Sequence, residues 1–405
     1  TTATSKKKRA NCLFGIVFGV TIANLCLFRG ALAKWQNRLL GLDPFFVDHV
    51  EGGDRGGSIM AKPLQIAHVI NTYNVVKDEA AQFYPLGQAQ NVTISSILRA
   101  LDYAAAAATH HETTGADKPS ISVTVLNAVY PQDLHVVPDD PRFVPHVLNR
   151  STLDLYPDMK PELQLPFLND LLHIPMEYCS RHGRNERNRC PFDYIIYTNA
   201  DIGLHETFYT KVASIIQRRP RQHRAFAINR RDLPARLSQF SDSPGDKEEE
   251  ELITGSPADL EEIYKRMPEG RDHPGTDCFI FLASLAADLM LGDMFLGFPP
   301  FAKTLTAQLV ALEPQYFKYP SERWNLTFHL GSDDDGKWKQ GIARRFSSMS
   351  MGEIKSLEYC GDRASRLMRY RKGLVPHLAQ NTRNCEATMR AFFMSRQQQS
   401  NSSAI

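Results

Sequence analysis

The order of strand and helix patterns that begins near residue 64 restricts the fold of this chain more than any other feature. An apolar run at 64–70 suits a buried strand, and 93–108 carries apolar residues at helical spacing. At 120–129 apolar residues alternate with polar ones, which indicates a second strand. Strand, helix and strand in this order predict a right-handed crossover between two parallel strands. The sequence therefore predicts an α/β fold with a mostly parallel sheet flanked by helices.

The same alternation of elements resumes after a proline-rich stretch at 131–166. Further strands are predicted at 194–197, 225–228 and 278–281. Further helices are predicted at 167–179, 206–218, 282–291 and 302–312. The acidic, turn-rich segment 241–251 is predicted to be a surface loop. With 405 residues, of which 42% are hydrophobic, the chain can form one large domain with insertions.

A basic cluster at 6–9 stands directly before an uncharged apolar run at 11–28. This combination is typical of a signal peptide or a signal anchor whose basic side stays in the cytosol. The run is about eighteen residues long, the lower limit for spanning roughly 30 Å of hydrocarbon. A small-x-small pattern would permit cleavage after Ala33, whereas Arg29 is unusual in a cleavage region. We expect an uncleaved anchor and a single-pass type II membrane protein of the endoplasmic reticulum or Golgi.

This topology divides the chain into a cytosolic tail at 1–10, the anchor, and lumenal segments. The glycine-rich stretch 34–62 is predicted to be a stem, 63–396 a lumenal domain, and 397–405 a disordered tail. Three asparagines of the lumenal domain stand in glycosylation sequons: Asn91, Asn149 and Asn325.

The cysteines and the net charge add two constraints. Cys179 and Cys190 flank a short polar loop, and we expect them to form a disulfide in an oxidising compartment. The cysteine spacings match no zinc motif. The formal net charge is +2 with basic and acidic residues interspersed, so we expect no nucleic-acid partner.

The strand at 194–197 runs directly into Thr-Asn-Ala-Asp, which ends at Asp201. Ligands of open α/β sheets bind outside the carboxyl ends of the strands, so a carboxylate at this position is well placed for function. A divalent cation with oxygen ligands, Mn²⁺ or Mg²⁺, would bind Asp201 and bridge it to a diphosphate. The alternative is that Asp201 only caps the helix predicted a few residues later, or only forms a turn.

A short strand that ends in the triplet Asn199-Ala-Asp201, within a lumenal α/β domain behind a type II anchor, resembles the GT-A glycosyltransferases. The resemblance spans roughly residues 64–338, and its motif is a D-x-D-like triplet. It implies a nucleotide-diphosphate sugar as donor and a metal ion held by the last acid of the triplet, Asp201. The sequence departs from the pattern at Asn199, where the first Asp is expected.

The resemblance also gives roles to two later segments. The turn from His273 to Asp277 resembles the acceptor side of such enzymes, where a carboxylate deprotonates the incoming hydroxyl. Asp277 is therefore the candidate general base, or else a structural residue of a Pro-Gly turn. His329 ends an apolar run and resembles the C-terminal histidine that joins the metal, with a structural histidine as the alternative. The acidic run 333–335 follows no strand and is predicted to be a solvated loop.

The donor nucleotide would lie over the first strand, with the turn Thr72, Tyr73, Asn74 near the base or ribose. Arg230 follows the strand at 225–228 and would neutralise phosphate charge, or else belong to an exposed basic face. The sequence contains no G-x-G-x-x-G, P-loop or G-x-S-x-G motif. Dinucleotide oxidoreductase, ATPase and serine hydrolase functions therefore lack their sites.

Together these features predict a metal-dependent glycosyltransferase of the secretory pathway. It would move a sugar from a nucleotide-diphosphate donor to a glycan, protein or lipid hydroxyl. The alternative is a non-catalytic lumenal glycan-binding or scaffold protein that retains the fold.

Overall fold

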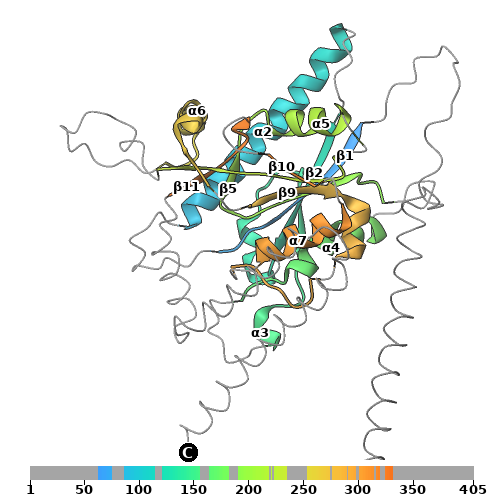
Figure 1. Cartoon of the computed structure of the whole chain (residues 1–405). Coiled ribbons are helices and arrows are strands. Elements are labelled where there is room, and N and C mark those ends of the chain that lie inside the picture. Colours follow the sequence, from blue (N-terminus) through green and yellow to red (C-terminus); the bar gives the residue numbers. More distant parts are fainter. Residues whose placement is uncertain are drawn as a thin grey trace, which may run out of the picture. The chain divides into compact units, whose positions relative to one another are not determined.

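The computed structural model describes thirteen stretches of the chain (Figure 1): residues 63–74, 86–114, 121–155, 164–181, 190–218, 220, 223–234, 253–273, 276–289, 291–297, 301–313, 316–319 and 324–331. All of them belong to one compact unit, Lys62–Ile405. The predicted cytosolic tail, anchor, stem, acidic loop, acidic run at 333–335 and C-terminal tail lie outside the described residues.

A seven-stranded sheet forms the centre of the unit, in the order β10-β6-β9-β4-β1-β2-β3. Its strands are β1 (Leu64–Asn71), β2 (Ile121–Val129), β3 (Phe143–Val147), β4 (Tyr194–Thr198), β6 (Ala225–Ile228), β9 (Cys278–Leu282) and β10 (Phe317–Tyr319). Neighbouring strands are parallel except where β9 lies between β4 and β6 and is antiparallel to both. The predicted mostly parallel sheet is confirmed. The direction of β9 could not be predicted, because a buried strand is apolar in either direction.

Helices cover both faces of this sheet (Figure 1). Helix α2 (Leu86–Thr114) and helix α5 (Phe208–Arg218) lie on one face, and α4 (Leu168–Arg181) and α7 (Phe301–Leu312) lie on the other. Alternate side chains of β1 serve the two layers: Ile66 packs with α2 and α5, whereas Ala67 packs with α4 and α7. Each large apolar side chain fully buried in these layers contributes about 1.5–3 kcal/mol to folding. Helix α2 connects β1 to β2 and confirms the predicted crossover.

Two segments differ from the prediction. The proline-rich stretch contains η1 (Pro131–Val136), β3 and α3 (Thr152–Leu155). Strand β3 accommodates Pro145 because it lies at the edge of the sheet, where one side of the strand has no ladder. The predicted helix at 282–291 is wrong, since only the 3-10 helix η5 (Ala283–Asp288) forms there. The backbone N–H groups of Leu282 and Ala283 still donate hydrogen bonds to the carbonyl oxygens of Arg224 and Asp193. These two residues therefore continue the sheet pairing, and the helical turns begin only after them.

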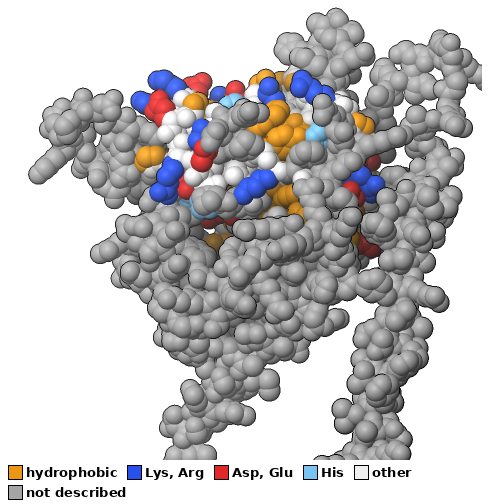
Figure 2. All heavy atoms as spheres, viewed as in Figure 1, with side chains coloured by type: hydrophobic (Ala, Val, Ile, Leu, Met, Phe, Trp, Pro, Cys, Tyr) orange, Lys and Arg blue, Asp and Glu red, His pale blue; other side chains and the backbone are white. Residues whose placement is uncertain are grey.

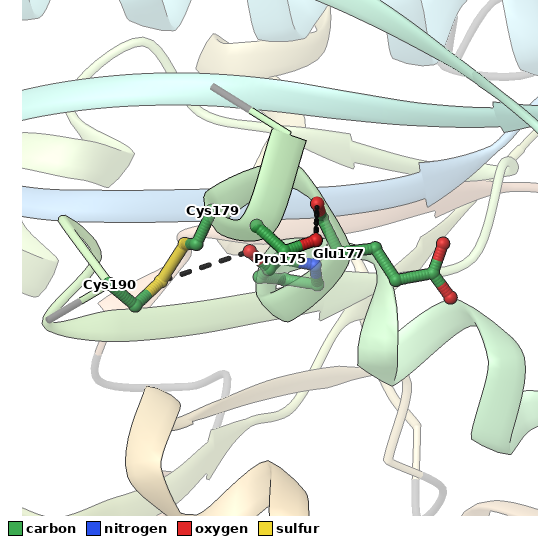
Figure 3. The surroundings of a disulfide bond; sticks show 5 residues. Pro175, Glu177, Cys179 and Cys190 are labelled. Carbon is green, nitrogen blue, oxygen red and sulfur yellow. Dashed lines mark hydrogen bonds between the residues drawn. A yellow bond between two sulfur atoms is a disulfide. The ribbon is translucent and has the colours of Figure 1, made fainter. Parts of the chain in front are cut away.

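Cys179 of α4 and Cys190 before β4 form a disulfide (Figure 3), with their Cα atoms 5.2 Å apart. The Sγ atom of Cys190 also lies 3.8 Å from the carbonyl oxygen of Pro175, the proline inside α4. The bond ties the end of α4 to the start of β4 across a separation of 11 residues. A closed loop of this size stabilises a fold by about 2–4 kcal/mol.

A second sheet has four short strands in the order β5-β11-β7-β8. They are β5 (Ile202–Leu204), β11 (Thr327–Leu330), β7 (Arg231–Leu233) and β8 (Arg271–Asp272). Helix α6 (Pro257–Arg266), continued by the 3-10 helix η4 (Met267–Glu269), packs on it through a small apolar cluster. The helix begins with a capping box between Ser256 and Asp259. The prediction from the sequence misses this sheet, because strands of two to four residues show no periodicity. It also misses α6, although Ser256, Pro257 and Asp259 form a helix-start signal.

Within the described part of the chain, no helix has both the length and the apolar character needed to cross a membrane. On the face seen in Figure 2, basic and acidic side chains of described residues stand next to each other, with hydrophobic side chains between them. Several charged side chains are paired, for example Arg142 with Asp102 and Arg266 with Glu262.

Candidate active site

Three connections between the two sheets carry the polar residues singled out in the sequence. The chain passes from β4 to β5 through 199–201, from β6 to β7 through 229–230, and from β8 to β9 through 273–277. The carboxyl ends of β4 and β6 lie at the same sheet edge as the amino end of the antiparallel β9. The structure therefore brings Asn199, Asp201, Arg230 and Asp277 to one place, and β11 adds His329.

The carboxylate of Asp201 faces the imidazole of His329, with 3.5 Å between Oδ2 and Nε2. Its side chain is 29% exposed, and that of His329 is 12% exposed. Removal from water raises the pKa of Asp201, but the hydrogen bond and charge of His329 and the charge of Arg230 outweigh this and lower the pKa to about 2. Asp201 is thus a carboxylate at neutral pH. Because Asp201 leads into β5, and α5 starts only at Phe208, the helix-cap alternative is wrong. The turn-former alternative is confirmed for the backbone: Asp201 lies in a turn that is closed by a 3.2 Å hydrogen bond from the Ile202 N–H to the carbonyl oxygen of Asn199.

The donor set of this pair fits a hard divalent cation. The Oδ1 atom of Asp201 is buried and has no hydrogen-bond partner among the described residues, so a cation could bind it without breaking an existing bond. Mn²⁺ and Mg²⁺ accept carboxylate oxygen, and Mn²⁺ also accepts imidazole nitrogen. No group of three or more His, Cys, Asp or Glu side chains in the described stretches could hold a metal. Asp201 and His329 alone would leave most coordination positions to phosphate oxygens and water.

Gly203 allows His329 to approach Asp201. In the antiparallel pair of β5 and β11, Gly203 lies opposite Phe328, and His329 lies opposite Ile202. A Cβ atom at Gly203 would overlap the ring of Phe328, which is 1% exposed and cannot swing aside. A glycine two residues after Asp201 is therefore required for the close packing of β11.

Asp277 is held at both carboxylate oxygens. Arg230 Nη1 lies 2.8 Å from Oδ2, and Asn199 Nδ2 lies 3.4 Å from Oδ1. The hydroxyl of Tyr197 donates a hydrogen bond of 3.0 Å to Oδ1 of Asn199. This bond fixes the amide orientation, so that Nδ2 of Asn199 points to Asp277. An Asp at position 199 would place a second negative charge beside Asp277. This explains physically why the triplet begins with Asn instead of the expected Asp.

The two arginines after β6 are buried, with 5% of Arg230 and 7% of Arg231 exposed. The alternative of an exposed basic face is therefore wrong. Arg230 binds Asp232 and Asp277, whereas Arg231 binds Asp272 at 2.7 Å.

The three sequons differ in their surroundings. Asn91 on α2 and Asn149 after β3 are exposed. Asn325 has a φ of 42°, and its Oδ1 accepts a 3.0 Å hydrogen bond from Nε of Arg231. Asparagine adopts this left-handed conformation more readily than most residues, so Asn325 has a structural role apart from its sequon.

Asp232 is the residue of this cluster that sequence reasoning missed. Its side chain is 3% exposed, and it lies 3.0 Å from Nε of Arg230 and 3.0 Å from Nδ1 of His273. Burial raises the pKa of Asp232, but the hydrogen bond from His273 and the charge of Arg230 lower it overall. The available signal was an Arg-Arg-Asp run just beyond the carboxyl end of a buried strand.

The predicted nucleotide turn lies at the carboxyl end of β1, the neighbour of β4. Thr72 donates a 2.9 Å hydrogen bond to Oδ1 of Asn127, and the backbone of Tyr73 exchanges two hydrogen bonds with the side chain of Gln90. Asn74 is exposed. The turn is thus fixed to β2 and α2 at the same sheet edge as Asp201.

Comparison with known proteins yields distant structural similarity only. No family model and no curated protein matches the chain. The solved structure of Staphylococcus aureus TarS 1–349 with UDP-GlcNAc is 9% identical, with a TM-score of 0.33, over 74% of this chain and 72% of that one. TarS 1–349 alone is 10% identical, with a TM-score of 0.35, over 81% and 92%. A longer TarS structure is 12% identical, with a TM-score of 0.33, over 74% and 43%.

Proposed function

We propose that this protein is a metal-dependent glycosyltransferase that uses a nucleotide-diphosphate sugar as donor and a glycan, protein or lipid hydroxyl as acceptor. The observation that carries the proposal is the pair formed by Asp201, just beyond the carboxyl end of β4, and His329 of β11, in which Oδ1 of Asp201 is buried and has no hydrogen-bond partner among the described residues. A buried carboxylate oxygen without a partner is costly unless a cation or donor completes it.

Asp201 and His329 would hold Mn²⁺ or Mg²⁺. When bound, the ion would act as a Lewis acid on the leaving diphosphate. Arg230 shares its guanidinium between Asp232 and Asp277, so its contribution to donor binding would be its charge rather than a direct phosphate contact. Thr72, Tyr73, Asn74 and Asn199 would complete the donor site from β1 and β4.

Asp277 would accept the proton of the acceptor hydroxyl. The hydrogen bonds that its carboxylate accepts from Arg230 and Asn199 use only part of the roughly four acceptor positions of a carboxylate. Its side chain is 12% exposed, so one edge reaches solvent. Fixed orientation favours a general base, because the proton must lie within about 2.6–3.2 Å of the accepting oxygen.

The decisive experiment measures binding of a panel of nucleoside diphosphates by calorimetry, with and without Mn²⁺. Wild type should bind one of them only when the metal is present, and Asp201→Asn should lose this metal-dependent binding. Asp193→Asn is the matched control, because Asp193 precedes the same strand at its opposite end and bonds to the backbone of Gln65. Metal-independent behaviour of wild type and both variants would refute the proposal and favour the scaffold alternative.

We also propose that the domain is lumenal, as a type II membrane protein of the endoplasmic reticulum or Golgi. The disulfide between Cys179 and Cys190 supports an oxidising compartment, where such bonds persist. In sealed microsomes, added protease should spare the domain, and a glycosidase should reduce its mass. Substituting the exposed Asn91 and Asn149 by Gln should reduce that shift, whereas digestion of the domain from outside would contradict the topology.

A further inference from the structure

Asp232 occupies the centre of the polar cluster between the two sheets. Apart from the 3.0 Å contacts with Arg230 and His273, its carboxylate lies 3.6 Å from Nη2 of Arg271 and 3.9 Å from Nδ1 of His329. A carboxylate buried this deeply is stable only with compensating charge and hydrogen bonds. Asp232 therefore has one well-defined position, which makes it suitable as a fixed point for its neighbours.

The sheet register places Asp232 directly beside His329. Strands β7 and β11 are parallel, with Asp232 opposite His329, while β5 brings Asp201 to the other side of the imidazole. The ring thus lies between two carboxylates, with Nε2 3.5 Å from Asp201 and Nδ1 3.9 Å from Asp232, so Asp232 acts on the ring by charge at a distance longer than a hydrogen bond. Histidines that bind metals commonly donate the N–H of their second nitrogen to a carboxylate, and a small shift of the ring on metal binding would bring Nδ1 within reach of Asp232.

Asp232 reaches the second functional carboxylate through Arg230. The Nε atom of Arg230 lies 3.0 Å from Asp232 Oδ1, and its Nη1 lies 2.8 Å from Asp277 Oδ2. Because the guanidinium is planar and rigid, fixing one edge with Asp232 also fixes the edge that holds Asp277.

We propose that Asp232 is a positioning residue that aligns His329 for metal binding and, through Arg230, aligns Asp277. This inference rests on the proposed metal-dependent function. Asp232 touches neither metal nor substrate in this arrangement, and it acts on the site only through the two side chains beside it.

The test compares Mn²⁺ binding by the full chain and its variants, followed by the electron paramagnetic resonance of free Mn²⁺. Measurements are made at a temperature where circular dichroism shows each variant to be folded. Asp232→Asn should weaken Mn²⁺ binding about 10–100-fold, the usual effect of losing a carboxylate behind a metal-binding histidine. Asp232→Glu should bind Mn²⁺ more weakly than wild type but more tightly than Asp232→Asn, since it keeps the charge but moves it.

Two controls separate this inference from the proposed function. Asp272→Asn removes another acid of the small sheet, one that binds Arg231, and should leave Mn²⁺ affinity unchanged. Asp201→Asn should abolish binding. If Asp201→Asn loses Mn²⁺ while Asp232→Asn binds like wild type, the positioning role is refuted and the metal site stands. If wild type itself does not bind Mn²⁺, the metal site and the positioning role both fail.

The conservative variant decides the remaining cases. If folded Asp232→Glu is as weak as Asp232→Asn, the effect comes from packing, and the positioning role is refuted. If Asp232→Asn does not fold, the Mn²⁺ affinity of Asp232→Glu is compared with wild type alone. Weakened Mn²⁺ binding then supports the role, and wild-type affinity overturns it.

Discussion

The large sheet and the small sheet of this protein follow different physical principles. The large sheet is built from apolar strands of up to nine residues, covered on both faces by helices. The small sheet has strands of two to four residues and encloses buried charges, among them Arg230, Arg231 and Asp232. Hydrophobic burial therefore holds the first region, whereas ion pairs and close packing determine the second. The proposed site lies where the two sheets are joined.

The largest effect is expected from His68, a polar residue in the core of the large sheet. It is fully buried between the hydroxyl of Tyr209 at 2.7 Å and that of Thr198 at 2.9 Å, and burial lowers its pKa to about 3 from an ordinary 6.5. In the unfolded chain His68 takes up a proton near pH 6.5, whereas in the folded chain it stays neutral down to about pH 3. The free energy of unfolding should therefore fall as the pH drops from 6.5 to 3. At about 1.4 kcal/mol per pKa unit, the free energy of unfolding should fall by roughly 5 kcal/mol over this pH range.

This prediction is checked by urea unfolding of wild type and His68→Gln at several pH values. Glutamine keeps hydrogen-bonding capacity but cannot titrate. The pH dependence of wild type should exceed that of the variant over this window, and equal slopes would show that His68 is not held neutral.

A second test removes apolar volume from the large sheet. Phe281 on β9 is fully buried, and Phe281→Ala should reduce the free energy of unfolding by about 3–5 kcal/mol through lost burial and a cavity. Denaturant unfolding measures the loss. Mn²⁺ affinity of the folded fraction should be unchanged, because Phe281 lies at the far end of β9 from Asp277. A parallel loss of affinity would show that the two regions are not separable.

Gly203 tests the close packing of the small sheet. Gly203→Ala places a methyl group into the ring of Phe328, and overpacking of a buried contact costs up to about 3 kcal/mol. Since β11 must move, His329 should move from Asp201, and Mn²⁺ affinity should fall together with the melting temperature. The double variant Gly203→Ala, Phe328→Leu frees space and should recover part of both. Unchanged Mn²⁺ affinity in Gly203→Ala would contradict the packing argument.

The smallest effect is expected from Asn199. Asn199→Asp would put a carboxylate about 3.4 Å from Asp277, where like charges raise the pKa of one partner. A carboxyl whose pKa is raised in the folded state lowers the free energy of unfolding at neutral pH by about 1.4 kcal/mol per pKa unit. This destabilisation disappears at low pH, where the carboxyl is protonated and the repulsion is gone. The variant should therefore be less stable than wild type at pH 7, with the gap narrowing toward pH 4. Thermal melts across this range measure the gap, and a constant difference would exclude charge repulsion as its cause.

The amino-acid sequence by itself determined the α/β class, the crossover of β1, α2 and β2, and most strands and helices of the large sheet. It also determined the cysteine pair and the candidates Asn199, Asp201, Arg230, Asp277 and His329. These features carry local signals, since apolar periodicity follows from burial, and a polar residue after an apolar strand lies at a sheet edge.

Only the tertiary structure decided the direction of β9, the small sheet, and the contacts among the candidate residues. It showed that Arg230 is buried between two acids and that Asp232 lies behind His329. Residues 201, 232, 277 and 329 are far apart along the chain, and ion pairs of such separation have no periodic signature. Their partners are chosen by strand pairing over long sequence distances, which depends on the whole fold rather than on any local segment.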